Sequence, residues 1–421
     1  MKSFIIKIFP FTKRILLESQ YVFYINLLEK LVFFIFFLIL ARELDKTNYG
    51  LIATVFAFTG ILNSVFDLGL GFYFQREAGT EGLKQKLDTA ITFRLSLMIL
   101  YIVLMFTYLY VNLSIDPAIL LIIGLFTYLS GFNVILNAVL YGKKKYKKSF
   151  GGFLISRIIF VFFTILFYLL KVQHYIILLS LLISVVFHIG ILFKYLHEEN
   201  LSIDLKFDFS ILKKILKSSI PIGLGLIFVL LYDRLDILII ERAISFEAVA
   251  IYSIAYSLYK IPTIICNVLL TPVFTDLSKS YTAKGKLSLN EIMIVAFLLL
   301  IISIGAIIFV NLFGERIIIF FYSNKYSLSI PYLKYLVYAL PGLFFNNLTG
   351  IISNSIRKEK IPMISNGLGA FINVTINILL IRVYGIWGAV IATIISEYLV
   401  FMIQFIFLIK HNLRFKFLTN Q

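Results

Sequence analysis

Apolar residues in this chain come in long runs, and these runs limit what it can fold into. The segment from Asn26 to Glu77 holds two of them, joined by the short polar stretch from Arg42 to Gly50. Each run approaches the ~20 residues that a helix needs to cross a bilayer. Hydrophobic residues make up 60% of the 421 residues, and charged residues only 14%. A water-soluble chain of this length needs far more polar surface, so the sequence predicts an all-α polytopic membrane protein.

The apolar runs predict twelve membrane-spanning helices, in two lobes of six. We expect a basic interfacial segment at 1–20, an N-terminal lobe at 21–196, a cytoplasmic linker at 197–215 and a C-terminal lobe at 216–421. The stretch FSILKKILKSS is expected to lie in the membrane interface before the seventh span. Weak matches between the halves indicate parallel repeats. The expected spans are 21–41, 51–75, 91–111, 118–141, 151–171, 174–195, 216–240, 247–273, 291–312, 328–353, 362–382 and 386–409.

The net charge of +17 could suggest a nucleic-acid partner, but the positions of the cations favour a membrane topology. With the N-terminus in the cytoplasm, the inner segments hold 27 of the 39 Lys and Arg residues, Arg94 included, and the outer loops hold 7. Inner loops of membrane proteins carry such an excess of Lys and Arg. We therefore expect both termini in the cytoplasm and no nucleic-acid partner. The basic run GKKKYKK at 142–148 is interpreted as part of this topology signal.

The remaining five cations lie inside predicted spans, as do several carboxylates. An ionisable group at membrane depth costs roughly 2.5–3.5 kcal/mol on the insertion scale, so it usually faces protein or a water-filled cavity. Four of these cations are candidates for binding a substrate in a cavity: Lys30, Lys260, Arg234 and Arg157. The candidate ion-coupling groups or charge partners are Glu29, Asp67, Asp233, Asp236 and Glu397. The fifth cation, Lys334, lies near the outer end of its span and is expected to snorkel to the interface.

Each candidate has a structural alternative. Arg157 could snorkel to the inner interface, and Lys30 could pair with Asp67. Arg234 could be neutralised by Asp233 and Asp236, which share a helix face at i and i+3. The carboxylates could form structural pairs instead of taking protons or Na⁺.

Lys260 has no acidic neighbour on its own helix, so a structural role is least expected there. Pro262 follows it and predicts a kink.

No catalytic or metal-binding pattern stands out. The single cysteine, Cys266, excludes an intrachain disulfide, and the four histidines are scattered. The chain holds no CxxC pair, no P-loop glycine spacing and no acidic metal-binding motif. The GLG at 69–71 is interpreted as a close-packing site. We therefore expect a protein without catalytic residues, metal or cofactor.

Several segments resemble a known family. They are LARELDKTNYGLIATVFAF, SVFDLGLGFYFQRE, YDRLDILIIERAISFEAVAIYSIAYSLYKIP and NILLIRVYGIWGAVIATIISEYLV. In this order they resemble the Wzx-type O-antigen flippases, which belong to the multidrug/oligosaccharidyl-lipid/polysaccharide exporter superfamily. The resemblance covers nearly the whole chain.

The resemblance implies a V-shaped pair of six-helix lobes that works by alternating access. It implies a cargo of undecaprenyl-pyrophosphate-linked oligosaccharide, moved from the inner to the outer leaflet of the bacterial cytoplasmic membrane for O-antigen or other surface polysaccharide. Implied partners are this lipid-linked cargo, membrane lipids and the polymerase and chain-length machinery. Coupling to H⁺ or Na⁺ stays one of two alternatives for the carboxylates. Basic cavity residues are a feature of the family. On this basis Lys30 and Lys260 are expected to face a central cavity and share the pyrophosphate.

Two other functions stay open at this point. One is a drug or small-solute exporter on the same scaffold, which would have a cavity dominated by acidic residues. The other is an integral-membrane polymerase or glycosyltransferase, which would need a larger outer loop or an acidic catalytic motif. The sequence does not identify the sugars, the coupling ion or the oligomeric state.

Overall fold

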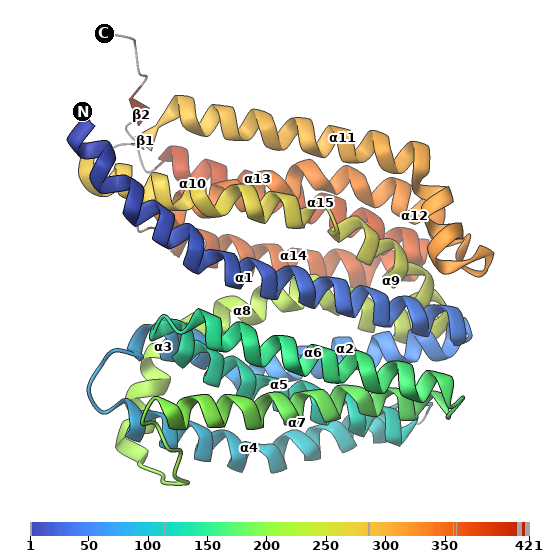
Figure 1. Ribbon diagram of the computed structural model, residues 1–421. Coiled ribbons are helices and arrows are strands. Elements are labelled where there is room, and N and C mark those ends of the chain that lie inside the picture. Colours follow the sequence, from blue (N-terminus) through green and yellow to red (C-terminus); the bar gives the residue numbers. More distant parts are fainter. Residues whose placement is uncertain are drawn as a thin grey trace. The chain divides into compact units, whose positions relative to one another are not determined.

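The computed structural model describes residues 2–112, 114–284, 287–356, 358, 360–410 and 415–416, and nearly all of these residues are helical (Figure 1). The first half contains α1 (Lys2–Glu43), α2 (Lys46–Asp67), α3 (Leu70–Glu77), α4 (Leu83–Val111), α5 (Pro117–Gly142), α6 (Tyr146–Leu169) and α7 (His174–Glu198). The second half contains α8 (Phe209–Ala243), α9 (Phe246–Lys260), α10 (Thr263–Lys284), α11 (Leu289–Tyr322), α12 (Ser329–Leu336), α13 (Leu340–Ser355), α14 (Lys360–Tyr384) and α15 (Ile386–Lys410).

Short elements complete the described part. The 3₁₀ turns η1 (Asn324–Tyr326) and η2 (Val337–Ala339) flank α12. The two-residue strands β1 (Leu287–Ser288) and β2 (Phe415–Lys416) pair in parallel.

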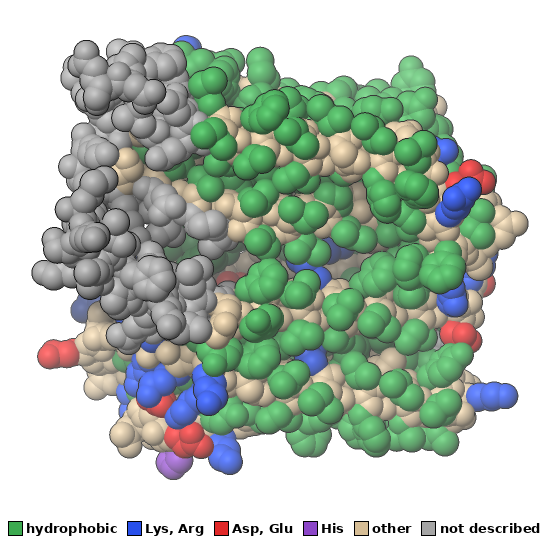
Figure 2. Space-filling view, turned by 45° about the horizontal axis from the view of Figure 1, so that its top comes forward, with side chains coloured by type: hydrophobic (Ala, Val, Ile, Leu, Met, Phe, Trp, Pro, Cys, Tyr) green, Lys and Arg blue, Asp and Glu red, His purple; other side chains and the backbone are tan. Residues whose placement is uncertain are grey.

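Twelve stretches of the described chain are long and apolar enough to cross a membrane. Each overlaps one of the twelve predicted spans, although several bounds differ by up to about ten residues, so the predicted all-α, twelve-span architecture is confirmed. Figure 2 shows hydrophobic side chains covering the middle of the helical face, while most charged side chains gather towards the helix ends. A surface of this kind suits contact with lipid, and the chain is a multi-pass membrane protein.

The chain forms two compact units. The first unit comprises Met1–Glu43 and Val55–Ile227, and the second comprises Leu44–Thr54 and Phe228–Gln421. The helices α2 and α8 are thus each divided between the units. The lobe boundaries drawn from the sequence stay predictions, and the basic segment at 1–20 has side chains outside the described part up to residue 19.

In the first unit, α5 is the central helix. It packs against α3, α4, α6 and α7, and α1 packs against α6. In the second unit, α13 packs against α10, α11, α14 and α15, while α12 packs against α9 and α15. The start of α2 is held here too, because Lys46 pairs with Glu247 at 2.8 Å.

The second predicted span, 51–75, is not one continuous helix. Leu68 and Gly69 both have positive φ, and they separate α2 from α3. A left-handed backbone interrupts a right-handed helix, so Asp67 ends α2 instead of lying inside a span. A Cβ on Gly69 would lie 2.6 Å from the carbonyl oxygen of Ser219, which fits the close-packing interpretation of this motif.

Two further expectations about helices have different outcomes. The kink at Pro262 is confirmed, since α9 ends at Lys260 and α10 begins at Thr263. The stretch FSILKKILKSS does not form a separate interfacial helix, because it continues through Pro221 as the first turns of α8. Its apolar and basic periodicity runs directly into the apolar run of the seventh span, and the helix continues even though Pro221 removes one of its backbone hydrogen bonds.

Candidate functional site

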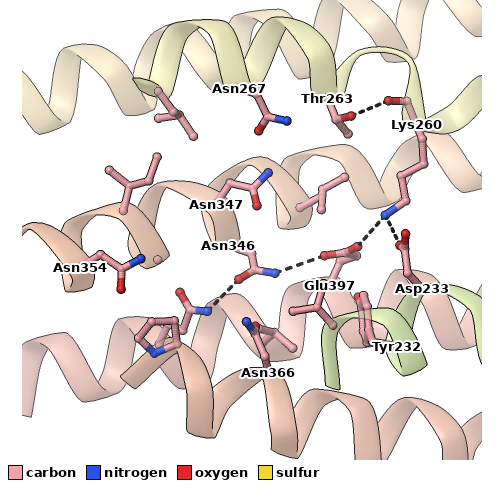
Figure 3. A pocket seen from close by; sticks show the side chains of 18 residues that line it. Tyr232, Asp233, Lys260, Thr263, Asn267, Asn346, Asn347, Asn354, Asn366 and Glu397 are labelled. Carbon is pink, nitrogen blue, oxygen red and sulfur yellow. Dashed lines mark hydrogen bonds and ion pairs between the residues drawn. The ribbon is translucent and has the colours of Figure 1, made fainter. Parts of the chain in front are cut away.

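The second unit encloses a polar cavity of about 500 Å³ (Figure 3). Six helices contribute to its wall, and they bring together residues that are up to 175 positions apart in sequence, from Val229 to Gln404. The polar lining residues are Tyr232 and Asp233 on α8, Lys260 on α9, Thr263 and Asn267 on α10, Asn346, Asn347 and Asn354 on α13, Asn366 on α14, and Glu397 and Gln404 on α15.

A lysine shared by two carboxylates forms the charged end of this cavity. The Nζ of Lys260 lies 2.7 Å from Oδ1 of Asp233 and 3.9 Å from Oε1 of Glu397. The hydroxyl of Tyr256 donates to the same oxygen of Asp233 at 2.6 Å. The Lys260 ammonium also lies 5.2 Å from the ring centre of Tyr256, a distance at which the ring attracts a cation. Lys260 is therefore held in place on several sides.

A structural role is least expected for Lys260 from the sequence, yet the structure gives it two acidic partners. Its own helix holds no partner, but Asp233 comes from α8 and Glu397 from α15. The packing of α8 and α15 against α9 brings these carboxylates to the ammonium. Contacts between helices that are far apart in sequence cannot be inferred from the residues adjacent to Lys260. Two carboxylates compete for one lysine here. Glu397 is completely buried, and its Oε1 accepts no hydrogen bond from any described residue.

Carboxamide side chains form the other end. The Nε2 of Gln404 donates to Oδ1 of Asn346 at 2.8 Å, and Nδ2 of Asn346 reaches Oε2 of Glu397 at 3.5 Å. The hydroxyl of Thr349 donates to Oε1 of Gln404 at 2.7 Å. This chain of hydrogen bonds links the amide end of the cavity to the charged end. Sequence reasoning did not single out these amides, because isolated Asn and Gln residues carry little signal.

Arg234 and Asp236 do not join this site. Asp236 is buried, accepts a hydrogen bond from the Tyr252 hydroxyl and accepts another from the backbone N–H of Ile237 at 2.8 Å. Arg234 is exposed and forms no ion pair within the described part of the chain. Arg234 therefore forms no direct ion pair with Asp233 or Asp236 in the described chain, and its neutralisation by them stays a prediction. Both aspartates instead receive hydrogen bonds from tyrosines of α9.

The first unit has a second polar cavity, of about 370 Å³. An Nη of Arg157 lies 3.5 Å from Oε1 of Glu29, and its guanidinium lies 4.8 Å from the ring centre of Phe153. The Arg157 side chain is only 13% exposed, so it does not snorkel as the alternative required. His188 also lines this cavity and is buried, with no hydrogen-bond partner for its Nε2 within the described chain.

Lys30 is exposed and is not among the lining residues of either cavity. Its proposed partner Asp67 pairs instead with Arg94, at 3.4 Å. The alternative in which Lys30 pairs with Asp67 is therefore wrong.

Arg94 is the charged residue that sequence reasoning misplaced. It was assigned to an inner loop, but it lies inside α4 and is completely buried. Its guanidinium donates to Asn63 Oδ1 at 2.6 Å and to the carbonyl oxygen of Tyr128 at 3.3 Å. Gly131 leaves room for it, since a Cβ there would lie 1.7 Å from Nη2. From sequence alone, a cation at the start of an apolar run is assigned to the preceding loop. Only the packed structure shows that Arg94 lies inside the helix and is buried.

Comparison with known proteins identifies the fold and the family. A solved structure of the lipid II flippase MurJ, in an inward closed conformation, has a TM-score of 0.74 and 16% identity; the match covers 94% of this chain and 87% of that one. An inward-facing multidrug resistance MATE family transporter of the MOP superfamily has a TM-score of 0.72 and 15% identity, with 91% and 94% covered. These likenesses show the fold. No curated protein matches the chain.

Family models match more directly. Residues 221–379 match the model described as MatE. Residues 17–278, more than half of the chain, match the model described as polysaccharide biosynthesis protein. The chain therefore belongs to the polysaccharide biosynthesis protein family.

Proposed function

We propose that the protein is a flippase for oligosaccharides linked to undecaprenyl pyrophosphate. It would move single repeat units from the inner to the outer leaflet of the bacterial cytoplasmic membrane, for O-antigen or another surface polysaccharide. A polymerase and chain-length machinery would then use the product. Membership of the polysaccharide biosynthesis protein family supports this proposal. So does the fold, which resembles that of a lipid II flippase.

The observation that carries the proposal is the second-unit cavity with its five asparagines, one glutamine and one tyrosine. A sugar is a dense array of hydroxyl groups that both donate and accept hydrogen bonds. Carboxamides offer donors and acceptors in the same way and carry no charge. A wall of this composition can replace the water around a sugar during its passage through the membrane.

Vesicles provide the test. The purified protein is reconstituted with a fluorescent undecaprenyl-pyrophosphate oligosaccharide, and an impermeant quencher reports which leaflet the label occupies. We expect labelled lipid to exchange between leaflets faster than in protein-free vesicles, without any increase in oligosaccharide length. Exchange no faster than in protein-free vesicles would refute the flippase. Chain elongation without an added polymerase would favour the enzyme instead.

A small-solute exporter is the second candidate, and one observation favours it. In each cavity the carboxylates outnumber the lysine or arginine: Asp233 and Glu397 with Lys260, and Glu29 and Asp67 with Arg157. An acidic cavity attracts cationic solutes and takes up H⁺ or Na⁺. Efflux of a cationic dye driven by an imposed ion gradient, with no movement of the lipid-linked oligosaccharide, would establish this alternative.

A further inference from the structure

Three asparagines in the second-unit cavity have hydrogen-bonding capacity that the described chain does not use. Asn354 and Asn366 form no hydrogen bond with any described residue, and Asn347 has only a weak contact with the Cys266 sulfur, at 3.8 Å. Their side chains come from α13 and α14 and line one cavity (Figure 3). Each carboxamide offers two N–H donors and one carbonyl acceptor. The cavity wall is therefore equipped to bind a ligand with many neutral polar groups.

The charges of the cavity argue against a phosphate ligand. Lys260 is the only cation among its lining residues, and it already has Asp233 at 2.7 Å. That partner is in place whether or not Glu397 carries a proton. An entering phosphate would meet a paired lysine and at least one carboxylate, and like charges repel strongly in a site of low dielectric. The pyrophosphate of a cargo is thus poorly matched to this cavity.

We infer that the second-unit cavity is a binding site for neutral sugars and discriminates against acidic ones. Sugar hydroxyl groups and acetamide groups can each pair with a carboxamide as donor and as acceptor. The apolar lining residues Val229, Leu343 and Val400 provide contacts for the C–H faces of a sugar ring. A volume of about 500 Å³ lies within the roughly 300–1,000 Å³ usual for small-molecule sites. This inference rests on the proposed function and narrows its substrate class; it replaces the expectation that Lys260 holds the pyrophosphate.

Binding of two disaccharides tests the inference. Full-length protein in nanodiscs is titrated with di-N-acetylchitobiose, which is neutral, and with the glucuronic acid–N-acetylglucosamine disaccharide, which is similar in size and anionic. Inorganic pyrophosphate is the third probe, and we expect it to bind more weakly than the neutral disaccharide because it also meets the carboxylates. We expect the neutral disaccharide to bind at least about tenfold more tightly than the anionic one, because the latter meets the carboxylates. Equal affinities, or no binding of the neutral disaccharide, would overturn the inference.

Single substitutions then locate the site. Asn347→Leu and Asn366→Leu remove the amide at nearly constant size, and each should weaken chitobiose binding about three- to tenfold. Asn311→Leu is the matched control, because Asn311 lies on α11 outside the cavity and, among the described residues, donates only to the Ile307 carbonyl oxygen. Elution profile and melting midpoint verify folding, and Asn366→Gln should retain most of the affinity. Two folded leucine variants that bind like the wild type would refute the site.

A charge substitution distinguishes a change in the preference for neutral over anionic sugars from a general loss of hydrogen bonds to the sugar. Glu397→Gln should narrow the preference for the neutral over the anionic disaccharide, whereas Asn366→Leu should weaken both to a similar degree. An unchanged preference in Glu397→Gln would contradict the role assigned to the carboxylates.

The outcomes also distinguish this inference from the proposed function. Asparagine-dependent binding of chitobiose without any lipid translocation would refute the flippase and leave the sugar site in place. Translocation that is unaffected by both leucine variants, without chitobiose binding, would refute only the sugar site.

Discussion

At the scale of single residues, removal of the Lys260 side chain should lower the stability of the protein. Truncation of one member of a buried ion pair leaves a charge without a partner and costs about 3–5 kcal/mol. The Lys260 and Asp233 side chains are 24% and 32% exposed, so they are only partly buried. We therefore expect Lys260→Ala to lower the free energy of unfolding by about 3 kcal/mol or less. The melting midpoint in detergent measures it.

Two further variants make this prediction specific. Lys260→Ala combined with Asp233→Asn should regain part of the loss, because no unpaired carboxylate remains at that position. Arg234→Ala should leave the melting midpoint nearly unchanged, since that side chain is exposed and forms no ion pair in the described structure. A double variant less stable than Lys260→Ala would show that the pair is not the source of the effect.

Gly131 gives a second prediction at this scale. An added Cβ would collide with the buried Arg94 guanidinium, which is fixed by Asn63 and has little freedom to move. Overpacking of this kind costs about 1–3 kcal/mol, so Gly131→Ala should lower the melting midpoint. Gly60→Ala is the matched control, because a Cβ at that helical position meets no atom within 4 Å. Equal midpoints for the two variants would contradict the packing argument.

At the scale of elements, the sequence predicted the helices well and their interruptions unevenly. A long apolar run must become a helix in lipid, because no water is present to satisfy its backbone polar groups. Proline predicts the interruption at Pro262, but Pro221 lies inside the continuous helix α8. The break after Asp67 needs a left-handed backbone at both Leu68 and Gly69; glycine adopts it readily, but leucine rarely does, so the sequence did not predict this break.

The candidate site could be predicted only in part. Lys260 and Glu397 stood out because charges are rare inside apolar runs. Their pairing depends on which helices pack together, and one sequence does not supply that information. The asparagines of α13 and α14 became meaningful only when the structure placed them around one cavity.

The connection between α7 and α8 provides a prediction about pH. Glu199 accepts from Lys148 at 2.7 Å and pairs with Lys145 at 3.1 Å, and the hydrogen bond from Lys148 lowers the pKa of Glu199 below its ordinary value of 4.5. A carboxylate with a lowered pKa stabilises the folded state above its unfolded pKa. This contribution is lost as the pH falls through the folded value.

We therefore expect residues 199–208 to exchange amide hydrogens faster as the pH falls below 4.5, after correction for intrinsic exchange rates. Glu199→Gln should weaken this pH dependence but not abolish it, because Lys84 and Ser210 likewise lower the pKa values of Asp204 and Asp208 in the same segment. Glu81→Gln should keep it, because Glu81 is an exposed residue with no ion pair in the described chain. The same pH response in Glu199→Gln and in the wild type would exclude Glu199 as the cause.

At the scale of the whole molecule, the distribution of cations determines how the chain enters the membrane. Removing the buried Arg94 from the inner count leaves 26 cations against 7 in the outer loops, so the asymmetry remains strong. The helix α5 gives this asymmetry a direct test, because the residues at its two ends are defined. Asp116 caps its N-terminus, and Lys143 to Lys145 follow its C-terminus directly. If α5 crosses the membrane, these two points must lie on opposite sides.

Reporter fusions test the topology. Fusions at Lys145 and Asp204 should be cytoplasmic, and fusions at Asn48 and Asp116 should be external, because segments rich in Lys and Arg stay on the cytoplasmic side. Two fusions on the same side at Asp116 and Lys145 would mean that α5 does not span the membrane. If the Asp116 fusion is cytoplasmic and the Lys145 fusion is external, the twelve spans stand and the predicted orientation is refuted. The orientation bears on the direction of transport, since it decides which mouth of each cavity the cytoplasmic leaflet can reach.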